Sequence, residues 1–251
     1  MTAQPIQDTV AEASDGKTPT LHVERLGRRF GRHWALARID LEVQPGEVVL
    51  LAGANGSGKT TLLRLVAGLF QPSRGQVRIC GLDPQRQPLQ CRRMLSMVSH
   101  QAYLYPRLSA FETARVWARL LGLPARAADL RPLLEEVGLS ERQDEPVVGF
   151  SAGMKKRLAL VRTRLERPRL VLLDEPFSAL DAAGRAMVDG WIQGFRAAGT
   201  SVLVASHTLA RAARLADRAV LLERGQVAWR GPAPGVVARM ETLAAGEAVS
   251  A

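Results

Sequence analysis

A glycine-rich loop constrains the fold of this chain more than any other feature. It reads Gly-Ala-Asn-Gly-Ser-Gly-Lys-Thr over residues 53–60 and fits the pattern G-x-x-x-x-G-K-[ST]. A predicted strand, Glu47 to Leu51, precedes it, and Leu62, Leu65 and Leu69 follow it at helical spacing. A strand, a tight loop and a helix in this order predict backbone N–H groups that point inward at phosphate oxygens.

Individual side chains of the loop predict further parts of a nucleotide site. Lys59 would supply a point charge for the β- and γ-phosphates, and the hydroxyl of Thr60 would be a ligand for Mg²⁺. The loop by itself does not separate kinases, GTPases, motors and transport ATPases. The predicted nucleotide-binding residues of this segment are Gly53, Asn55, Gly56, Ser57, Gly58, Lys59, Thr60 and Thr61.

A pair of acids ends a second apolar run and narrows the choice. Leu170 to Leu173 are followed directly by Asp174 and Glu175. At a strand end beside the loop, Asp174 can hold Mg²⁺ through water, and Glu175 can polarise the attacking water as a general base. Two carboxylates at the end of a buried strand are costly without a cation. The alternative is an ordinary strand end at the surface.

The rest of the chain alternates apolar strands with helices, which indicates an α/β fold with a parallel sheet covered on both faces. Residues 1–19 are polar and predict a flexible tail. The interval from about 102 to 166 reads as mainly helical, and Ser109 with Glu112 forms a capping-box signature near its start. Residues 237–251 are alanine-rich and predict only a C-terminal tail.

Further motifs complete a resemblance to the ABC (ATP-binding cassette) ATPase family over about residues 20–235. They are the signature-like segment Phe150 to Met154, the D-loop Ser178 to Asp181, the switch histidine His207, the Q-loop glutamine Gln101 and the adenine-stacking aromatic Phe30. The resemblance implies a P-loop NTPase domain over residues 20–236 that binds ATP and Mg²⁺. It would have a RecA-like parallel sheet core, an antiparallel β subdomain and an inserted helical subdomain at about 102–166.

The resemblance also implies roles for residues outside the loop. His207 would contact the γ-phosphate and orient the water together with Glu175. Gln101 would join them as a catalytic residue, and it would bind the metal with Thr60 and Asp174.

Phe30 would offer its ring to the adenine base, because a phenylalanine presents a π-face as a tyrosine does. Two alternatives stay open. Phe30 could be an ordinary core aromatic, and Trp34 is the nearest competitor for the stacking role.

The signature-like segment predicts a dimer. Ser151 is a good N-cap, so its hydroxyl and the N–H of Gly153 form a second anion site at a helix start. In the family this second site caps the ATP held by a partner, which implies a homodimer around two ATP molecules. Phe150, Ala152 and Met154 depart from the usual Leu-Ser-Gly-Gly-Gln. Because Ser151 and Gly153 are kept, we expect activity to survive.

The segment after Gln101 is where subunits of this family dock their membrane partners. Tyr103, Leu104 and Tyr105 form an apolar loop that is costly to leave in water. We therefore predict that they line a groove for a short cytosolic helix of a transmembrane permease subunit.

Two sequence features are similar to export-type subunits, among them the ATP-binding subunit of the haem exporter used in cytochrome c maturation. They are the run Val98 to Gln101 followed by Leu104 and Tyr105, and the Phe-Ser-x-Gly-Met-Lys pattern that begins at Phe150. Multidrug and lipid exporters share most of these features. A soluble ABC protein acting on DNA or ribosomes is an alternative from another class. Such proteins carry a long coiled-coil insertion or two cassettes, and this chain has one cassette and no heptad insertion.

Composition bounds the location and the partners. The net charge of +10 raises nucleic acid as a partner, but the arginines are scattered, without a basic tail or an aromatic-basic stripe. A solvated basic surface or contact with anionic lipid headgroups explains the charge, and no nucleic acid is expected. The longest apolar runs are too short to span a bilayer. We expect a cytoplasmic chain, peripheral on the inner face of the cell membrane, with Cys80 and Cys91 as free thiols.

Overall fold

A three-stranded antiparallel sheet forms the first part of the fold. The computed structural model describes residues 18–99 and 104–248. The strands of this sheet, in the order β2-β1-β4, are β2 (His33–Val43), β1 (Leu21–Phe30) and β4 (Arg74–Ile79). β1 and β2 make a hairpin in which Phe30 pairs with His33. Gly31 at its tip has a φ of 58°, a left-handed conformation that glycine adopts readily.

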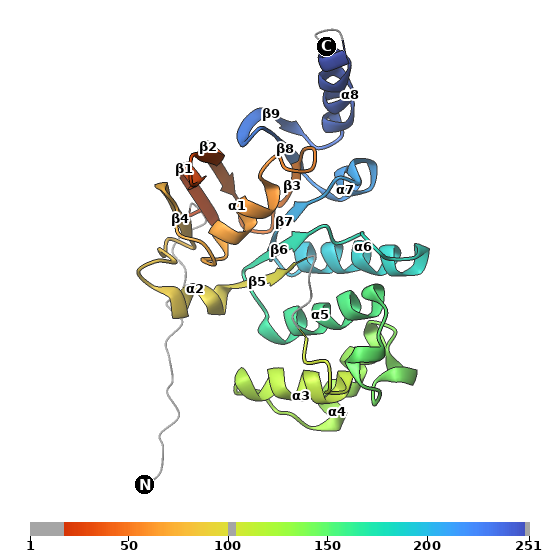
Figure 1. The fold of residues 1–251 in the computed structure, drawn as a ribbon. Helices are drawn as coiled ribbons and strands as arrows, with labels where there is room; N and C mark the ends of the chain where they lie inside the picture. The colour runs from red at the N-terminus through yellow and green to blue at the C-terminus, as the bar shows by residue number, and fades with distance from the viewer. Residues whose placement is uncertain (1–17, 100–103, 249–251) are drawn as a thin grey trace.

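A six-stranded sheet forms the centre of the molecule (Figure 1). In the order β5-β6-β7-β3-β8-β9, its strands are β5 (Leu95–Val98), β6 (Leu170–Asp174), β7 (Ser201–Ala205), β3 (Val48–Ala52), β8 (Arg218–Glu223) and β9 (Gln226–Pro232). The first five are parallel, and β9 returns antiparallel to β8 across Arg224 and Gly225. Every residue of β3, β6 and β7 is buried, as expected for parallel strands covered on both faces.

The two faces of β3 belong to two hydrophobic cores. Val49 and Leu51 pack in one core with helix α1 (Lys59–Val66) and the antiparallel sheet. Val48 and Leu50 pack in the other core with the helices that follow β5 in the chain. The alternation follows from the two-residue period of a strand. The predicted α/β fold, with a parallel core sheet and an antiparallel β subdomain, is confirmed.

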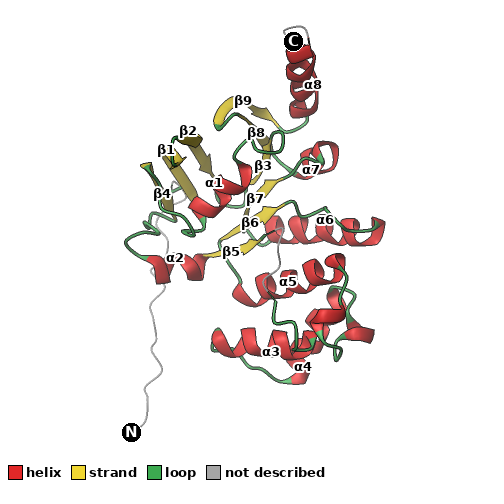
Figure 2. Cartoon of the chain, viewed as in Figure 1, coloured by secondary structure: helices red, strands yellow, loops and turns green. Residues whose placement is uncertain are grey.

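Three helices stack beside β5 and β6 (Figure 2). They are α3 (Ala110–Leu120), α4 (Ala127–Glu136) and α5 (Ala152–Glu166), with the short 3-10 turns η1 (Ser140–Arg142) and η2 (Val147–Gly149) between the last two. The predicted capping box is present at the start of α3. The Glu112 N–H donates to Ser109 Oγ at 3.1 Å, and the Ser109 N–H donates to Glu112 Oε2 at 2.9 Å.

The remaining helices are α2 (Pro88–Met94), α6 (Ala182–Ala197), α7 (Leu209–Leu215) and α8 (Gly235–Ala248). The segment for which the sequence predicted only a C-terminal tail is thus helical as far as Ala248. The domain boundaries and the flexible tail over 1–19 stay predictions, since residues 1–17 lie outside the described part of the chain. Within residues 18–99 and 104–248, no helix is both long and apolar enough to cross a bilayer.

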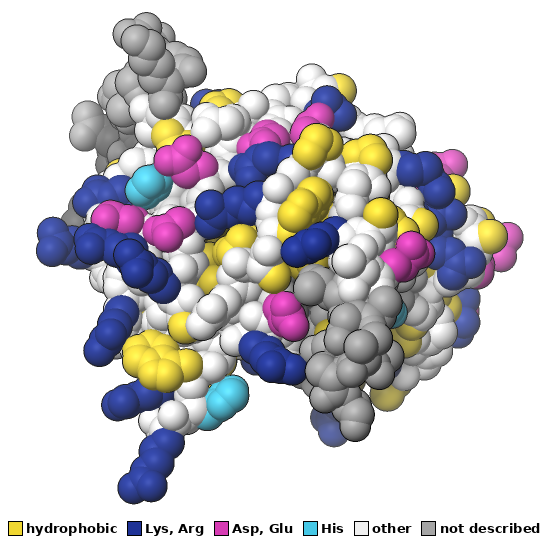
Figure 3. Space-filling model, turned by 90° about the horizontal axis from the view of Figure 1, so that it is seen from above, with side chains coloured by type: hydrophobic (Ala, Val, Ile, Leu, Met, Phe, Trp, Pro, Cys, Tyr) yellow, Lys and Arg dark blue, Asp and Glu magenta, His cyan; other side chains and the backbone are white. Residues whose placement is uncertain are grey.

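Charged side chains are distributed over the surface and not gathered in one patch on the face seen from above. Figure 3 shows Lys and Arg side chains spread over this face, with Asp and Glu side chains among them. On this face the distribution agrees with the scattered arginines of the sequence.

Candidate nucleotide-binding and hydrolysis site

The loop between β3 and α1 depends on glycine for its shape. Gly53, Gly56 and Gly58 have φ values of 143°, 81° and 107°. A Cβ at Gly53 would lie 2.3 Å from the carbonyl oxygen of Leu222, and a Cβ at Gly58 would lie 2.6 Å from Leu36 Cδ2. Gly58 is also the N-cap of α1. Side chains are therefore excluded from the two positions that let the loop close over the start of the helix.

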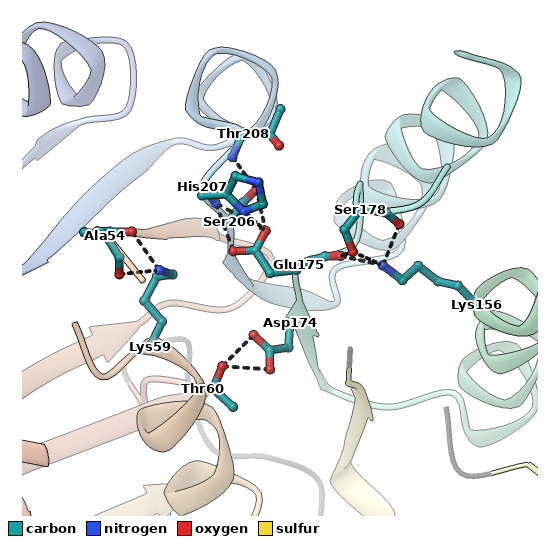
Figure 4. A network of polar contacts seen from close by, with 11 residues as sticks. Ala54, Lys59, Thr60, Lys156, Asp174, Glu175, Ser178, Ser206, His207 and Thr208 are labelled. Carbon is teal, nitrogen blue, oxygen red and sulfur yellow. Dashed lines mark hydrogen bonds and ion pairs between the residues drawn. The ribbon is translucent and has the colours of Figure 1, made fainter. Parts of the chain in front are cut away.

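Lys59 is held inside the loop. Its Nζ donates to the carbonyl oxygens of Gly53 at 2.7 Å and Ala54 at 3.0 Å (Figure 4). Burial lowers the pKa of the Lys59 ammonium, and the carboxylates of Glu175 and Asp174 act in the opposite direction. The loop therefore contains a fixed cation at the positive end of α1, where an anion is favoured.

Ser57 adds a second indication of a ligand in the loop. Its Oγ is buried and has no hydrogen-bond partner among the described residues. A buried hydroxyl without a partner costs free energy, so native structures seldom leave one in place without a ligand or water. An oxygen-rich anion beside the loop would supply the missing partner.

Thr60 and Asp174 meet across the site. The Thr60 hydroxyl lies 3.1 Å from Asp174 Oδ1 and 3.0 Å from Oδ2, and the Asp174 side chain is buried at the end of β6. Hydroxyl and carboxylate oxygens are the ligands that Mg²⁺ prefers. The described residues contain no group of three or more His, Cys, Asp or Glu side chains that could hold a metal alone. A cation held by one carboxylate, one hydroxyl and substrate phosphates needs no such group.

Glu175 and His207 meet next to this pair. Glu175 comes directly after β6 and has a φ of 52°. Its N–H donates at 2.8 Å to the carbonyl oxygen of Ala205, the last residue of β7. Its carboxylate accepts the His207 N–H at 3.1 Å through Oε1, and the His207 Nδ1 lies 2.8 Å from Oε2. The Ser206 hydroxyl lies 3.4 Å from the same Oε2. The backbone turn thus aims the carboxylate at the loop after β7 (Figure 4).

One open cleft of about 750 Å³ brings the predicted residues together. From the loop and its helix it is lined by Asn55 and Thr60, and from β6 and β7 by Asp174, Glu175 and His207. Thr60 and Asp174 are 114 positions apart in the sequence. These residues meet because the carboxyl ends of parallel strands lie at the same edge of the sheet. Such an edge is the usual ligand site of an open α/β sheet.

Ser151 and Gly153 lie elsewhere. The Ser151 side chain is exposed and caps α5, where its Oγ accepts the Met154 N–H at 3.2 Å. A Cβ at Gly153 would lie 2.9 Å from the carbonyl oxygen of Ala179, so glycine allows α5 to start close to the segment after β6. Neither residue is among the described residues that line the cleft.

The sequence of this chain is similar to those of known proteins. Residues 36–178 match the ABC transporter family. The cytochrome c biogenesis ATP-binding export protein CcmA of Pseudomonas putida (strain GB-1) is 38% identical over 195 residues, which are 76% of this chain and 92% of that protein. The chain belongs to the ABC transporter ATP-binding family. It is therefore an ABC ATPase, as the resemblance implied.

Other relatives of this ABC ATPase have a different direction of transport in their names. The aliphatic sulfonates import ATP-binding protein of Pseudomonas aeruginosa (strain UCBPP-PA14) is 38% identical over 214 residues, 82% of this chain and 73% of that protein. A solved ATP-binding cassette, dimeric in a post-hydrolysis state with ADP and Pi, gives a TM-score of 0.77 at 23% identity. The structural alignment covers 85% of this chain and 98% of that cassette, and it shows that the two proteins have the same fold.

Two departures from the ABC signature are packing residues. Phe150 and Met154 are buried in the core that also contains Val48 and Leu50, with exposed fractions of 4% and 9%. The Arg142 guanidinium lies 5.8 Å from the Phe150 ring centre and 3.7 Å from the Met154 sulfur. The changed side chains thus pack inward, whereas Ser151 keeps its place at the helix start.

Phe30 is not a core aromatic. Its side chain is 44% exposed at the end of β1, and its ring packs edge-on against Phe70 at 5.8 Å. The Arg28 guanidinium lies 4.6 Å from the ring centre. Trp34, the competitor, lies instead within 6 Å of the guanidinium groups of Arg29 and Arg74. Stacking of adenine on Phe30 stays a prediction.

Two residues of the predicted ABC machinery lie outside the described residues. They are the Q-loop glutamine Gln101 and the docking residue Tyr103. Of their neighbours, Leu104 is half-buried and packs on a hydrophobic core, and Tyr105 is 50% exposed.

Lys156 has a place in the site that its sequence motif did not predict. This side chain is 5% exposed, and its Nζ donates to the Glu175 carbonyl at 2.6 Å. Helical periodicity carried the signal, because Leu160 and Thr163 stand four and seven residues later on the same buried face of α5.

Proposed function

We propose that this ABC ATPase is the ATP-hydrolysing subunit of an exporter and that Glu175 is its general base. The observation that carries the assignment is the meeting, in one cleft, of the Lys59 loop, the Thr60–Asp174 pair and the Glu175–His207 pair. A phosphate-binding loop, a metal pair and a carboxylate poised for proton transfer are the parts that phosphoryl transfer to water requires.

The proposed chemistry begins with the loop. Backbone N–H groups and Lys59 bind the β- and γ-phosphates. The water oxygen forms a bond to the γ-phosphorus while the Glu175 carboxylate accepts a proton from that water. The bond from the γ-phosphorus to the bridging oxygen breaks, and ADP and phosphate are released. His207 holds that carboxylate through its N–H and its imidazole. His207 would also contact the γ-phosphate, which fixes the water between the phosphate and the base.

Mg²⁺ fits the same cleft. Thr60 and Asp174 would hold the ion, and Gln101 is the third predicted ligand. When bound, the ion would neutralise negative charge on the phosphates. The short contacts between the Thr60 hydroxyl and both Asp174 oxygens support this assignment, because the two side chains already converge.

Two copies of the chain would form the active unit. Ser151 and Gly153 lie at the start of α5, and neither lines the cleft of its own chain. A second copy can bring this helix start to the γ-phosphate held by the first. The dimeric state of the structural neighbour that carries ADP and Pi supports the arrangement.

Transmembrane permease subunits would dock beside Tyr103, Leu104 and Tyr105 and keep the chain on the inner face of the cell membrane. The export direction rests on the sequence likeness around this loop and on the 38% identity to an export protein of cytochrome c biogenesis. Haem is the cargo we propose, and a multidrug or lipid exporter is the second candidate. Inside-out vesicles with the purified complex would accumulate haem when ATP is added, and no accumulation would contradict that cargo.

The hydrolysis proposal is tested with three purified proteins. Glu175→Gln keeps the shape of the side chain but removes the base, so kcat should fall about 100-fold or more. The control is Glu135→Gln, an exposed carboxylate on α4, which should hydrolyse ATP at the rate of the unmodified protein. With ATP and Mg²⁺, light scattering should give twice the monomer mass for Glu175→Gln. If Glu175→Gln hydrolyses ATP at the native rate, Glu175 is not the general base. If its mass with ATP and Mg²⁺ is that of a monomer, the proposed dimer is wrong.

A further inference from the structure

The buried ammonium of Lys156 lies between α5, the helix that Ser151 caps, and the turn after β6. The side chain leaves the first turns of α5 and reaches three acceptors (Figure 4). Its Nζ lies 2.6 Å from the Glu175 carbonyl oxygen, 2.9 Å from the Ser178 carbonyl oxygen and 2.6 Å from Ser178 Oγ. A lysine ammonium has three N–H donors, so each of them has a partner.

The acceptors belong to an unusual stretch of backbone. Glu175 and Ala179 both have left-handed φ values, 52° and 59°, which residues other than glycine seldom adopt. Such conformations persist only when surrounding contacts hold them. The Ser178 hydroxyl bridges back to the Glu175 carbonyl at 2.9 Å, and the ammonium binds the same carbonyl. The turn is thus closed around one cation.

Lys156, together with Ser178, binds the carbonyl group of Glu175, which neither Ala205 nor His207 contacts. The Glu175 N–H is bound by Ala205, and its carboxylate by His207. The carbonyl group, on the opposite side of the residue, is bound from α5. Burial lowers the pKa of the Lys156 ammonium to about 8, and the carboxylates of Glu175 and Asp174 act in the opposite direction.

We propose that Lys156 is a positioning residue that fixes Glu175 for proton transfer and couples it to the start of α5. The inference rests on the proposed function, in which Glu175 is the base and Ser151, at the start of the same helix, caps the partner's ATP. Lys156 then links Ser151, which would contact the partner's nucleotide, to Glu175, which would act on the nucleotide of its own chain. Movement of Ser151 against the partner's nucleotide is transmitted through α5 to the base at the chain's own nucleotide.

The coupling predicts a split between turnover and binding. Lys59 and Thr60, which would bind the phosphates, belong to α1, and the Lys156 contacts lie on the turn after β6. Removing the ammonium should therefore leave the affinity for ATP within about twofold. Turnover should fall about 10- to 100-fold, because small displacements of a catalytic group have effects of that size.

The experiment compares Lys156→Met, which removes the ammonium but keeps an unbranched side chain of similar length, with Lys156→Arg, which keeps a positive charge and N–H donors. The matched control is Lys155→Met, the neighbouring lysine, whose backbone N–H donates to the Ser151 carbonyl oxygen at 3.0 Å, a bond that the substitution keeps. Measured are kcat, KM and the dissociation constant of a fluorescent ATP analogue. We expect a lowered kcat and unchanged binding in Lys156→Met, partial recovery in Lys156→Arg and native values in Lys155→Met.

Two results would overturn the inference: a kcat for Lys156→Met within twofold of the native value, or a loss of ATP binding equal to the loss of turnover. Should Lys156→Met not fold, Ser178→Ala and Lys156→Gln replace it. Each removes part of the same network, and native kcat in both overturns the inference equally. Glu175→Gln, measured in parallel, separates this failure from that of the proposed function, because native turnover in Glu175→Gln refutes the base whatever Lys156 does.

Discussion

His207 Nδ1 lies 2.8 Å from Glu175 Oε2, and the His207 backbone N–H lies 3.1 Å from Oε1 of the same carboxylate. One residue thus holds the carboxylate by two separate groups. Only one of these groups depends on the side chain, so the two contributions can be separated by substitution.

His207→Ala should lower kcat, but less than Glu175→Gln does. The substitution removes the imidazole and keeps the backbone N–H on the carboxylate, so the proposed base stays in place but the water is less well oriented. We expect a fall of about 10- to 100-fold in kcat, measured at saturating ATP. A His207→Ala variant with native turnover would leave the imidazole without a role in hydrolysis.

The contiguous motifs are the part of this site that the sequence could predict. Residues 53–60 are contiguous, and Asp174 and Glu175 directly follow an apolar run. The spacing of these residues along the sequence is therefore enough to predict their roles. The capping box at Ser109 is local in the same sense. Family resemblance was needed for His207, because a single histidine after a strand carries no pattern of its own.

Contacts between distant segments could not be predicted in this way. Lys156 bonds to residues 19 and 22 positions away, and a Lys-Lys-Arg run reads as a solvated face until the fold buries one member. Likewise, the burial of Phe150 and Met154 depends on how α5 packs. Helix α8 was missed because its alanine-rich sequence lacks an amphipathic stripe.

The Lys156 ammonium predicts an alkaline fall in activity. Below pH about 8 it offers three donors to three acceptors, and above this pH the neutral amine offers two. The charged groups that face it are the carboxylates of Glu175 and Asp174. We therefore expect kcat to fall as pH rises through about 8, and Lys156→Arg, which stays charged, to keep its activity to higher pH.

Stability should move in the opposite direction to activity. The pKa of Lys156 is lowered from 10.5 in the unfolded reference to about 8 in the fold, so between these values the unfolded chain binds more protons. The contribution of Lys156 to the free energy of unfolding therefore rises with pH through that window. Urea unfolding and kcat, both measured from pH about 7 to 9.5, check the two signs. An identical alkaline limb in Lys156→Arg would assign it to another group, such as Lys59.

Gly58→Ala should destroy nucleotide binding. A Cβ there would lie 2.6 Å from Leu36 Cδ2 and 2.8 Å from the Ala35 carbonyl oxygen, at a φ of 107° that alanine avoids. We expect a loss of about 1–3 kcal/mol of stability from the strain, with loss of ATP binding as the loop opens. Gly190→Ala on α6 is the control, since its Cβ would meet nothing within 4 Å and a helix gains from alanine. Calorimetry of ATP binding and urea unfolding distinguish the two variants.

Phe30→Ala and Trp34→Ala decide which aromatic stacks on adenine. Base–aromatic stacking is worth about 1–3 kcal/mol, so loss of the right ring should raise the dissociation constant of ATP about tenfold. We expect this for Phe30→Ala, because its ring is exposed and flanked by Arg28. Trp34 lies between two arginines instead. A larger loss in Trp34→Ala would reverse the assignment.

Tyr105→Asp tests docking on the proposed permease more cleanly than Leu104→Asp. Leu104 packs on a hydrophobic core, so a charge there disturbs the fold as well as the surface. Tyr105 is 50% exposed, and an aspartate there changes only what a partner meets. We expect Tyr105→Asp to keep the ATPase rate and the unfolding midpoint of the isolated chain, while co-purification with membrane subunits falls several-fold. An exposed apolar residue whose replacement by a charge leaves co-purification and transport at native levels cannot belong to the docking surface, and the partner contact would then have to lie elsewhere on the chain.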